Sequence, residues 1–316
     1  MRAAVVTVFD RAPRYEEFPT PTASGPDDLL VQVLAAGLHP RVRSQADGSH
    51  YTSTDQLPLI PGIDGVGRTP DGTLRYFILP DTNLGAMADY TVIDIRRSVP
   101  LPPGTDPIQV AAAMNPAMSS WLALGNRISF QPGQRVLVLG ATGNAGRMAI
   151  QVARHLGAED VVAVGRGADR LADLDAERTV SLDDDPATIG QRLGDAAADV
   201  DVVLDYLWGQ PAADALVAMV PRRADDSQAL HWIQIGSVAG AQSPIPSAAL
   251  RATNLRILGS GQGSIPTRGI LRELPHLAAE INRGTFDIQA KAMPLADVEQ
   301  AWARAAASSQ RLVLVP

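Results

Sequence analysis

The chain has 316 residues, 46% of them hydrophobic, which is enough for two domains with a substantial core. Its formal net charge of −7 and the lack of a basic run argue against a nucleic-acid-binding groove. The sequence contains no cysteine, which excludes disulfides, thiolate zinc sites and a cysteine nucleophile. We read no signal peptide and no apolar run long enough to span a membrane, so we expect a cytoplasmic protein.

The first hundred residues are expected to form a compact β-rich domain. Residues 3–8 and 29–35 are rich in residues that favour strands, and proline and glycine interrupt the segments that follow. After this region the pattern becomes helical, and we expect two helices, at 107–114 and 119–128.

Strands and helices then alternate along the chain. We expect strands at 136–139, 161–164, 202–205 and 232–235. We expect one helix that follows the first of these strands and ends at 156, and two more at 168–174 and 212–220. Strands joined by helical crossovers form a parallel sheet that is covered on both faces. This part of the sequence therefore predicts a domain of the α/β class.

The last part of the chain returns to the first domain. An edge strand is expected at 256–258, followed by helices at 268–282 and 296–307 and a strand at 311–315. A terminal strand needs a partner, and the β-rich domain is the expected place for it. The α/β domain is therefore expected to be inserted within the β-rich one.

A glycine-rich turn, GATGNAG, joins the strand at 136–139 to the next helix. It is similar to the dinucleotide fingerprint G-x-G-x-x-G, except that alanine replaces the first glycine and Gly140 supplies the tight turn. Gly143 lets the backbone approach a pyrophosphate, and Gly146 lets helix and strand pack closely. The helix N-terminus offers N–H groups to the phosphates. The expected cofactor contacts here are Gly140, Thr142, Gly143, Asn144, Ala145 and Gly146. The alternative is a purely structural turn.

The end of the next strand indicates which dinucleotide binds. An NAD-binding enzyme usually has a carboxylate here for the ribose 2′-hydroxyl, whereas this chain has Gly165 and Arg166. An arginine fork favours a 2′-phosphate, and Arg170 is a second cation on the same helix face. We therefore expect NADP(H) as the cofactor; the alternative is a pair of exposed helix arginines.

Other strand ends of the parallel sheet supply further candidate contacts. Ligands bind at the carboxyl ends of strands in such sheets. Gly236 and Ser237 follow one expected strand and Ser260 follows another, and Asp205 and Tyr206 occupy a similar place. We include Gly236, Ser237 and Ser260 among the cofactor-binding residues, although glycines at such places also serve as plain turn residues.

Five segments, in this order, resemble the medium-chain dehydrogenase/reductase superfamily, and specifically its zinc-independent, quinone oxidoreductase-like branch. They are AAGLHPRVRSQADGSHY, LIPGIDGVG, GAMADY, NPAMSSWLAL and GATGNAG. The resemblance implies a GroES-like catalytic domain at 1–112 and 252–316, a Rossmann domain at 113–251, and an active site between the two. It also implies a homodimer joined at the edge strand near 256–258.

The chain departs from the zinc-binding members of this family. Their cysteine, histidine and cysteine positions correspond here to His39, Ile63 and Asn115, and isoleucine cannot bind a metal. We therefore expect no metal. The usual substrate contacts of the branch also differ, because His39 replaces an asparagine and Val42 an aspartate.

Without a metal, a quinone or an α,β-unsaturated carbonyl suits hydride transfer, because conjugation spreads the developing charge. The resemblance implies Tyr51 as proton donor, with a loop tyrosine as the alternative. It also places Asn115 and Ser119 near the nicotinamide and the substrate, with helix capping or back-bonding as the alternative. His39 is the third catalytic candidate, with core packing as its alternative, and Asp64 is expected to brace a loop.

The sequence therefore predicts a zinc-independent, NADPH-dependent oxidoreductase that reduces quinones or α,β-unsaturated carbonyls. The expected partner is a small-molecule substrate, with no nucleic acid and no membrane. The alternative is a redox-inactive NADP(H)-binding protein, either crystallin-like or a cofactor sensor. NADPH oxidation with a panel of quinones and enones separates these hypotheses.

Overall fold

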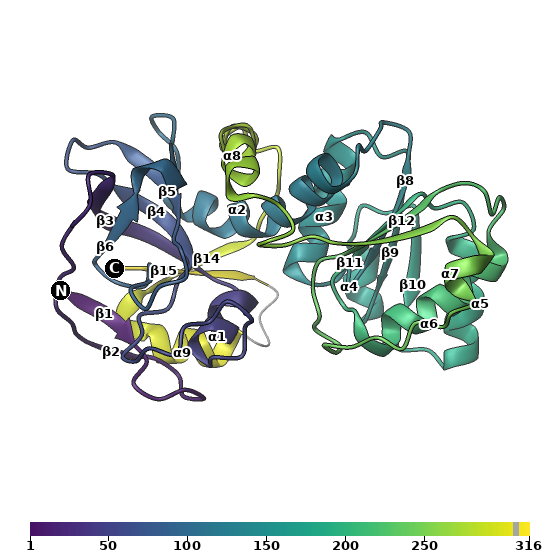
Figure 1. The fold of residues 1–316 in the computed structure, drawn as a ribbon, viewed down its shortest axis with the longest axis horizontal. Coiled ribbons are helices and arrows are strands. Elements are labelled where there is room, and N and C mark those ends of the chain that lie inside the picture. The colour runs from purple at the N-terminus through teal and green to yellow at the C-terminus, as the bar shows by residue number, and fades with distance from the viewer. Residues whose placement is uncertain (306–309) are drawn as a thin grey trace. The chain divides into compact units, whose positions relative to one another are not determined.

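The computed structural model describes residues 1–305 and 310–316, which form two compact units (Figure 1). Unit 1 contains Met1–Asn115 and Leu271–Pro316, and unit 2 contains Pro116–Ile270. The division differs from the expected boundary at 251, because the strand at Leu255–Gly259 pairs within the sheet of unit 2. It also differs from the expected boundary at 112, since the division follows Asn115, inside the helix Pro107–Leu122.

Unit 1 is built on a mostly antiparallel sheet in the order β14-β15-β3-β4-β5-β7, with β6 also paired to β3. Its strands are β3 (Asp28–Leu38), β4 (Asp64–Arg68), β5 (Leu74–Ile78), β6 (Tyr90–Asp94), β7 (Ser98–Pro100), β14 (Ala290–Pro294) and β15 (Arg311–Val315). A separate hairpin joins β1 (Arg2–Val5) to β2 (Arg14–Glu17). The strand expected at 311–315 therefore forms in unit 1, antiparallel to β3.

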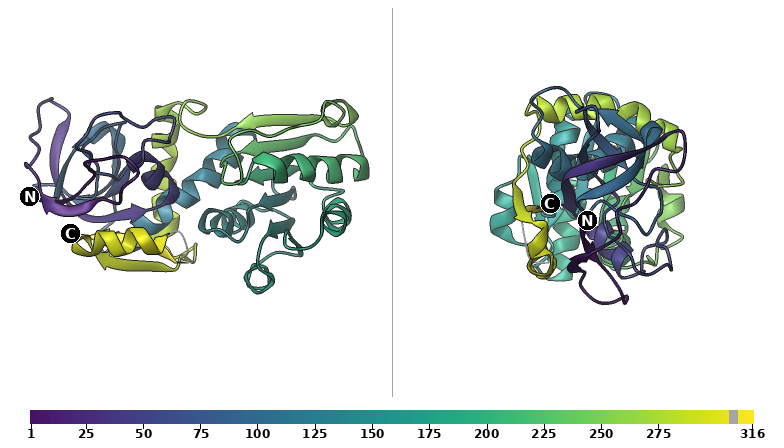
Figure 2. Two further views of the ribbon diagram at one scale, coloured as in Figure 1. Left: turned by 90° about the horizontal axis from the view of Figure 1, so that it is seen from below. Right: turned by 90° about the vertical axis from the view of Figure 1, so that its left-hand side faces the viewer.

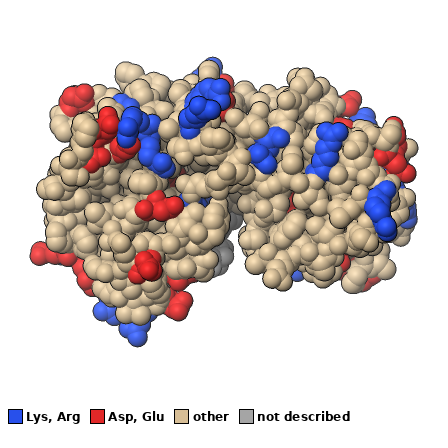
Figure 3. All heavy atoms as spheres, in the orientation of Figure 1, with Lys and Arg blue, Asp and Glu red and all other residues tan. Residues whose placement is uncertain are grey.

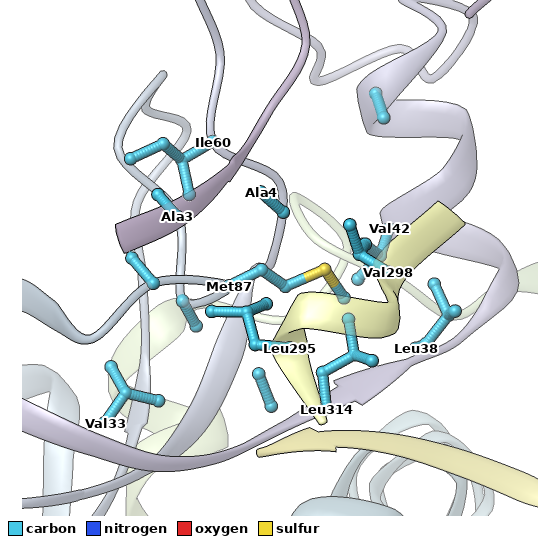
Figure 4. Close-up of a cluster of buried hydrophobic side chains, with 14 of the residues drawn as sticks. Ala3, Ala4, Val33, Leu38, Val42, Ile60, Met87, Leu295, Val298 and Leu314 are labelled. Carbon is cyan, nitrogen blue, oxygen red and sulfur yellow. The ribbon is translucent and has the colours of Figure 1, made fainter. Parts of the chain in front are cut away.

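Residues from both chain segments make the core of unit 1. Figure 4 shows side chains from β1, β3 and β15 packed around Met87. Helix α1 (Pro40–Ala46) and helix α9 (Val298–Ala305) contribute Val42 and Val298 to the same cluster. Helix α9 lies along β14, β15 and β2 (Figure 2). The expected helix at 296–307 thus appears as far as Ala305, and its last two residues lie outside the described part.

Unit 2 is a parallel six-stranded sheet in the order β10-β9-β8-β11-β12-β13, which confirms the expected α/β fold class. Its strands are β8 (Arg135–Leu139), β9 (Asp160–Gly165), β10 (Arg178–Ser181), β11 (Val202–Asp205), β12 (Leu230–Gln234) and β13 (Leu255–Gly259). The central strands are nearly continuous apolar runs because both of their faces are buried. The strand order reverses between β8 and β11, which is where open parallel sheets bind ligands.

Helices cover both faces of this sheet (Figure 1). They are α3 (Asn144–His155), α4 (Ala168–Ala172), α5 (Pro186–Ala196), α6 (Gly209–Met219) and α7 (Ala249–Ala252). Leu137 and Leu139 pack into one cluster with residues of α5 and α6, and the alternating Val136 and Val138 point to the other face. Strand β10 and helix α5 were not expected from the sequence, because their segment is largely polar.

The two helices expected on either side of Pro116 are one helix, α2 (Pro107–Leu122), so that expectation was wrong. The helix continues through the proline into a π-helical segment, η2 (Ala123–Arg127). Helix α8 (Thr267–Asn282) likewise contains Pro275. The divisions between the units fall within these two helices, after Asn115 and after Ile270. The short 3₁₀ helices are η1 (Ile95–Arg97), η3 (Val220–Arg222) and η4 (Leu295–Asp297).

Charged side chains of both signs are scattered over the face in Figure 3. No continuous basic area is visible on that face. None of the helices in the described part of the chain combines the length and the apolar character that a bilayer crossing requires.

Candidate functional site

The turn after β8 is made by Gly140, as the sequence predicted. Its φ of +96° lies in the region that favours glycine. The N–H groups of Gly140 and Ala141 both donate to the carbonyl of Val164, at 2.9 Å each, which ties the turn to the end of β9. Gly143 then donates to the carbonyl of Gly140 at 3.2 Å and forms the N-cap of α3.

Gly146 is the glycine that the packing requires most strictly. A Cβ atom there would lie 2.3 Å from the carbonyl oxygen of Gly140 and 2.7 Å from Cα of Ala141. Helix α3 therefore lies directly on the turn, and no larger residue fits without moving backbone. At Gly143 an added Cβ would meet only the carbonyl oxygen of Gly140, at 3.5 Å, so the outer side of the turn is open.

The start of α3 fits an anion. Gly143 provides no side-chain cap, and among the described residues no side chain caps the first turn of α3. Unpaired N–H groups and the positive end of the helix dipole together form a cradle for phosphate. The residues of this cradle, Asn144, Ala145 and Gly146, are those expected from the sequence, and they fit the pyrophosphate of a dinucleotide.

Thr142 connects the turn to the end of β9. A Cβ atom at Gly165 would lie 3.0 Å from both Oγ1 and Cγ2 of Thr142. The absence of a side chain at Gly165 therefore leaves room for Thr142, and the two expected cofactor residues lie side by side.

Two expected arginines lie around the loop that follows β9. Arg166 is exposed, with 73% of its side chain accessible. The side chain of Arg170 folds over Gly167, where an added Cβ would lie 2.7 Å from its Nε. Arg147, in the first turn of α3, donates to the carbonyl of Arg170 at 3.1 Å. The start of α3 and helix α4 are thereby joined, and Arg147, Arg166 and Arg170 place three cations around this loop.

The end of β11 reaches the same turn. A Cβ atom at Gly140 would lie 3.3 Å from Cβ of Tyr206, and one at Gly236 would lie 2.7 Å from the carbonyl oxygen of Tyr206. The Tyr206 hydroxyl is 2.9 Å from Oγ of Ser119, and Ser119 donates its single proton to the carbonyl of Pro116 at 2.7 Å. Tyr206 is therefore the donor in this pair. Burial raises the pKa of Tyr206 to about 12, so the phenol stays protonated.

Ser119 thus shows the back-bonding to Pro116 that the sequence analysis left open, and its oxygen also binds Tyr206. The remaining expected residues lie at strand ends, as anticipated. Ser237 is exposed after Gly236, and the N–H of Ser260 donates to the carbonyl of Gln234 at 2.8 Å.

Asp205 fixes the loop that follows β11. Its side chain is fully buried, and Oδ1 accepts from the N–H groups of Leu207 and Trp208, at 2.8 Å each. Oδ2 accepts from Nε1 of Trp232 at 2.9 Å. Burial raises the pKa of this carboxyl, and these hydrogen bonds oppose the rise. Asp205 therefore holds the strand end that carries Tyr206.

Unit 1 contains a buried polar group centred on Asp64. Nε2 of His39 lies 3.1 Å from Oδ1 of Asp64, and the Tyr76 hydroxyl donates to Oδ2 at 2.6 Å. All three residues are at most 2% exposed. Arg311, on β15, is 4% exposed; burial lowers its pKa to about 10, against the opposing charge of Asp64. Asp64 lies on β4, not in the loop that it was expected to brace, and it binds His39, which precedes α1, and Tyr76 on β5. Sequence reasoning missed Tyr76 and Arg311.

Burial lowers the pKa of His39, although hydrogen bonding and charge from Asp64 oppose that shift. The imidazole is therefore neutral at pH 7. A carboxylate accepts hydrogen bonds only, so Nε2 carries the proton and Nδ1 is an acceptor. Nδ1 is buried and has no hydrogen-bond partner among the described residues.

The other two catalytic candidates of unit 1 differ from His39 in exposure. Tyr51 follows α1 in the chain and is 73% exposed, with its ring centroid 4.4 Å from that of His50. Asn115 is half-buried on α2. In the described part of the chain, no three His, Asp or Glu side chains converge as a metal site.

No family model matches the chain, but individual proteins do. A probable NADPH-dependent quinone reductase from Emericella nidulans is 32% identical over an alignment of 359 positions, which covers 100% of both chains. A trans-enoyl reductase from Aspergillus terreus is 28% identical over 153 residues, or 42% of each chain. The solved quinone oxidoreductase from Thermus thermophilus, also studied in complex with NADPH, matches with a TM-score of 0.79 and 25% identity, over 100% of both chains.

Proposed function

The chain belongs to the quinone oxidoreductase-like branch of the medium-chain dehydrogenase/reductase superfamily, and from this we infer that it is an NADPH-dependent reductase of quinones or α,β-unsaturated carbonyls. The observation that carries this function is the glycine turn of unit 2. Gly146 packs directly on Gly140, the first N–H groups of α3 are uncapped, and Arg166 follows the neighbouring strand.

We propose that unit 2 binds NADP(H) through the residues of this turn. When bound, NADPH supplies the hydride. The N–H groups of Asn144 and Ala145 hold the pyrophosphate, and Arg166 and Arg170 hold the 2′-phosphate. Gly236, Ser237, Ser260 and Ser119 contact the nicotinamide half. Gly236, Ser237 and Ser260 follow strands of the sheet, and Gly236 lies against Tyr206. Ser119, on α2, is 2.9 Å from the Tyr206 hydroxyl. These positions support the assignment.

We propose that no zinc takes part. Ile63 occupies a position at which zinc-binding members have a ligand, and the chain has no cysteine. Hydrogen-bond donors therefore have to stabilise the negative charge that develops on the substrate oxygen. A quinone or enone needs less of this stabilisation than a simple ketone, because its conjugated system delocalises the charge.

For enones, the proposed proton donor is Tyr51. Delivery of a hydride to the alkene leaves an enolate, which must gain a proton to form the saturated product. The 73% exposure of Tyr51 supports this role, because a donor must be accessible to a substrate. His39 suits it less well, since its proton on Nε2 is held by Asp64. We propose that His39 and Asn115 shape the substrate side of unit 1.

We further propose a cytoplasmic homodimer. Strand β13 is the last in the sheet order of unit 2, so its outer edge offers unpaired backbone groups to a second copy. The lack of cysteine is compatible with a reducing compartment.

The deciding experiment is steady-state oxidation of NADPH with a panel of quinones and enones, repeated with NADH. Turnover with NADPH and a quinone or enone supports the reductase. If NADPH binds in a titration but no acceptor in the panel is reduced, the redox-inactive alternative is the correct one.

A further inference from the structure

A carboxylate lies beside the two arginines that the proposed function assigns to the 2′-phosphate. Asp183 follows β10, whose Ser181 is paired with Gly165 of β9. The N–H of Leu182 donates to the carbonyl of Gly165 at 2.8 Å, so the chain after β10 is fastened to the end of β9. Sequence reasoning missed Asp183 because β10 itself was not found.

The two carboxylate oxygens of Asp183 have different partners. Oδ2 accepts from the N–H of Gly167 at 2.7 Å, and this N–H belongs to the loop between β9 and α4. Oδ1 lies 3.9 Å from Nε of Arg166. Both side chains are about half exposed or more, at 52% for Asp183 and 73% for Arg166. The ion pair is therefore weak and open to exchange.

The charges around this loop set up a competition. Arg147, Arg166 and Arg170 supply three positive charges, while Asp183 and the exposed Asp169 of α4 supply negative ones. A 2′-phosphate brings up to two negative charges to the same place. It attracts Arg166, and it is repelled by the carboxylate that already pairs with Arg166. Asp183 is anchored by Gly167 and cannot move away without losing that hydrogen bond.

We propose that Asp183 is a specificity-determining residue that competes with the 2′-phosphate for Arg166 and so limits the preference for NADP(H) over NAD(H). This inference rests on the proposed function, since it takes Arg166 as the 2′-phosphate contact. Asp183 has two separable roles: Oδ2 shapes the loop, and the charge on the carboxylate restrains the arginine.

Asp183→Asn separates these roles, because the amide oxygen still accepts from Gly167 while the charge is lost. The probes are adenosine 2′,5′-bisphosphate and 5′-AMP, titrated calorimetrically into the whole chain. We expect Asp183→Asn to bind the bisphosphate about three- to fivefold more tightly and 5′-AMP unchanged, in keeping with an exposed ion pair. If the asparagine variant folds poorly, the same two affinities are measured in Asp183→Ser, whose hydroxyl oxygen can also accept a hydrogen bond.

Asp184→Asn is the matched control. It removes the same charge one residue along, from a carboxylate that pairs with Arg192 at 2.6 Å. It should leave both affinities unchanged, and an equal gain in Asp184→Asn would show that net charge alone is responsible and overturn the inference. An equal gain from Asp183→Asn in the Arg166→Ala background, where the arginine paired with Asp183 is absent, would also overturn the inference.

Binding to the parent chain distinguishes a failure of the 2′-phosphate assignment from a failure of the role of Asp183. If the bisphosphate binds no better than 5′-AMP to the parent, the 2′-phosphate assignment of the proposed function fails. If it binds better, but neither Asp183→Asn nor Asp183→Ser changes the ratio, only the role of Asp183 is refuted.

Discussion

Nε2 of His39 lies 3.1 Å from Oδ1 of Asp64, and both side chains are shielded from solvent inside unit 1. Because burial lowers the pKa of His39, the unfolded chain gains a proton at this residue before the folded chain does. The contribution of His39 to stability is therefore complete above its unfolded pKa of about 6.5 and is lost as the pH falls below that value.

We accordingly expect the free energy of unfolding to fall between pH 6.5 and 5, with His39 contributing up to about 1.4 kcal/mol per pH unit. Denaturant titrations across this range measure the slope. His39→Gln should reduce this slope. His50 and His231, whose pKa values burial also lowers, add to the slope with the same sign in every variant. An unchanged slope in His39→Gln would show that His39 does not titrate in this way.

Gly146→Ala should destabilise unit 2 by about 1–3 kcal/mol, because the new Cβ would overlap the carbonyl oxygen of Gly140. Denaturant unfolding measures the loss of stability, and NADPH titration of the folded protein measures the effect on cofactor binding. Gly190→Ala is the control: this glycine lies inside α5 with nothing within 4 Å of an added Cβ, so alanine should be neutral or stabilising. Equal stability of Gly146→Ala and the parent would show that α3 can lift from the turn.

Arg166→Ala should weaken NADPH binding roughly ten- to hundredfold and leave NADH nearly unchanged, since a charge-assisted contact to a phosphate contributes about 1.5–3 kcal/mol. Fluorescence titration with both cofactors gives the two affinities. Arg192→Ala, on α5 and paired with Asp184, controls for the loss of a surface charge. Equal losses for NADPH and NADH in Arg166→Ala would refute the 2′-phosphate assignment.

Tyr51→Phe keeps the ring and removes only the hydroxyl. We expect kcat for enones to fall roughly 10²-fold, with NADPH affinity unchanged, because the enolate loses its proton donor. Quinone reduction should suffer less, since hydroquinone oxygens take protons from water. Tyr90→Phe, at another exposed tyrosine of unit 1, should have no effect. If Tyr51→Phe reduces enones at the parent rate, Tyr51 is not the donor.

A dimer should be seen by light scattering at micromolar concentration, because the outer edge of β13 is open to pairing. A monomeric parent protein would contradict the proposed assembly.

The glycine turn after β8 was the easier part to predict from sequence. Glycine has strict physical reasons to occur at Gly140 and Gly146, and both reasons act between residues that are close in the chain. A strand, a turn and a helix in succession are enough to recognise them. The same holds for Arg166, whose place is set by the end of β9.

The parts that were missed depend on contacts between distant residues. Tyr76 and Arg311 meet the Asp64 group only after strands β4, β5 and β15 have paired, and nothing local in the sequence marks them. Pro116 was expected to separate two helices because proline lacks the N–H that a helix interior uses. In the folded chain α2 continues through it, and Ser119 binds the carbonyl of Pro116.

The pairing of β15 with β3 has a consequence for the order in which the chain is made. Unit 2 is continuous in sequence, so it can fold on the ribosome as soon as it emerges. Unit 1 begins to emerge earlier, but β3 receives β15 only after all of unit 2 has been translated. Until then the edge of β3 that β15 later covers has no partner strand. Leu38 and Val33 also lack the core residues that the C-terminal segment contributes. The first domain to be translated is thus the last to be completed.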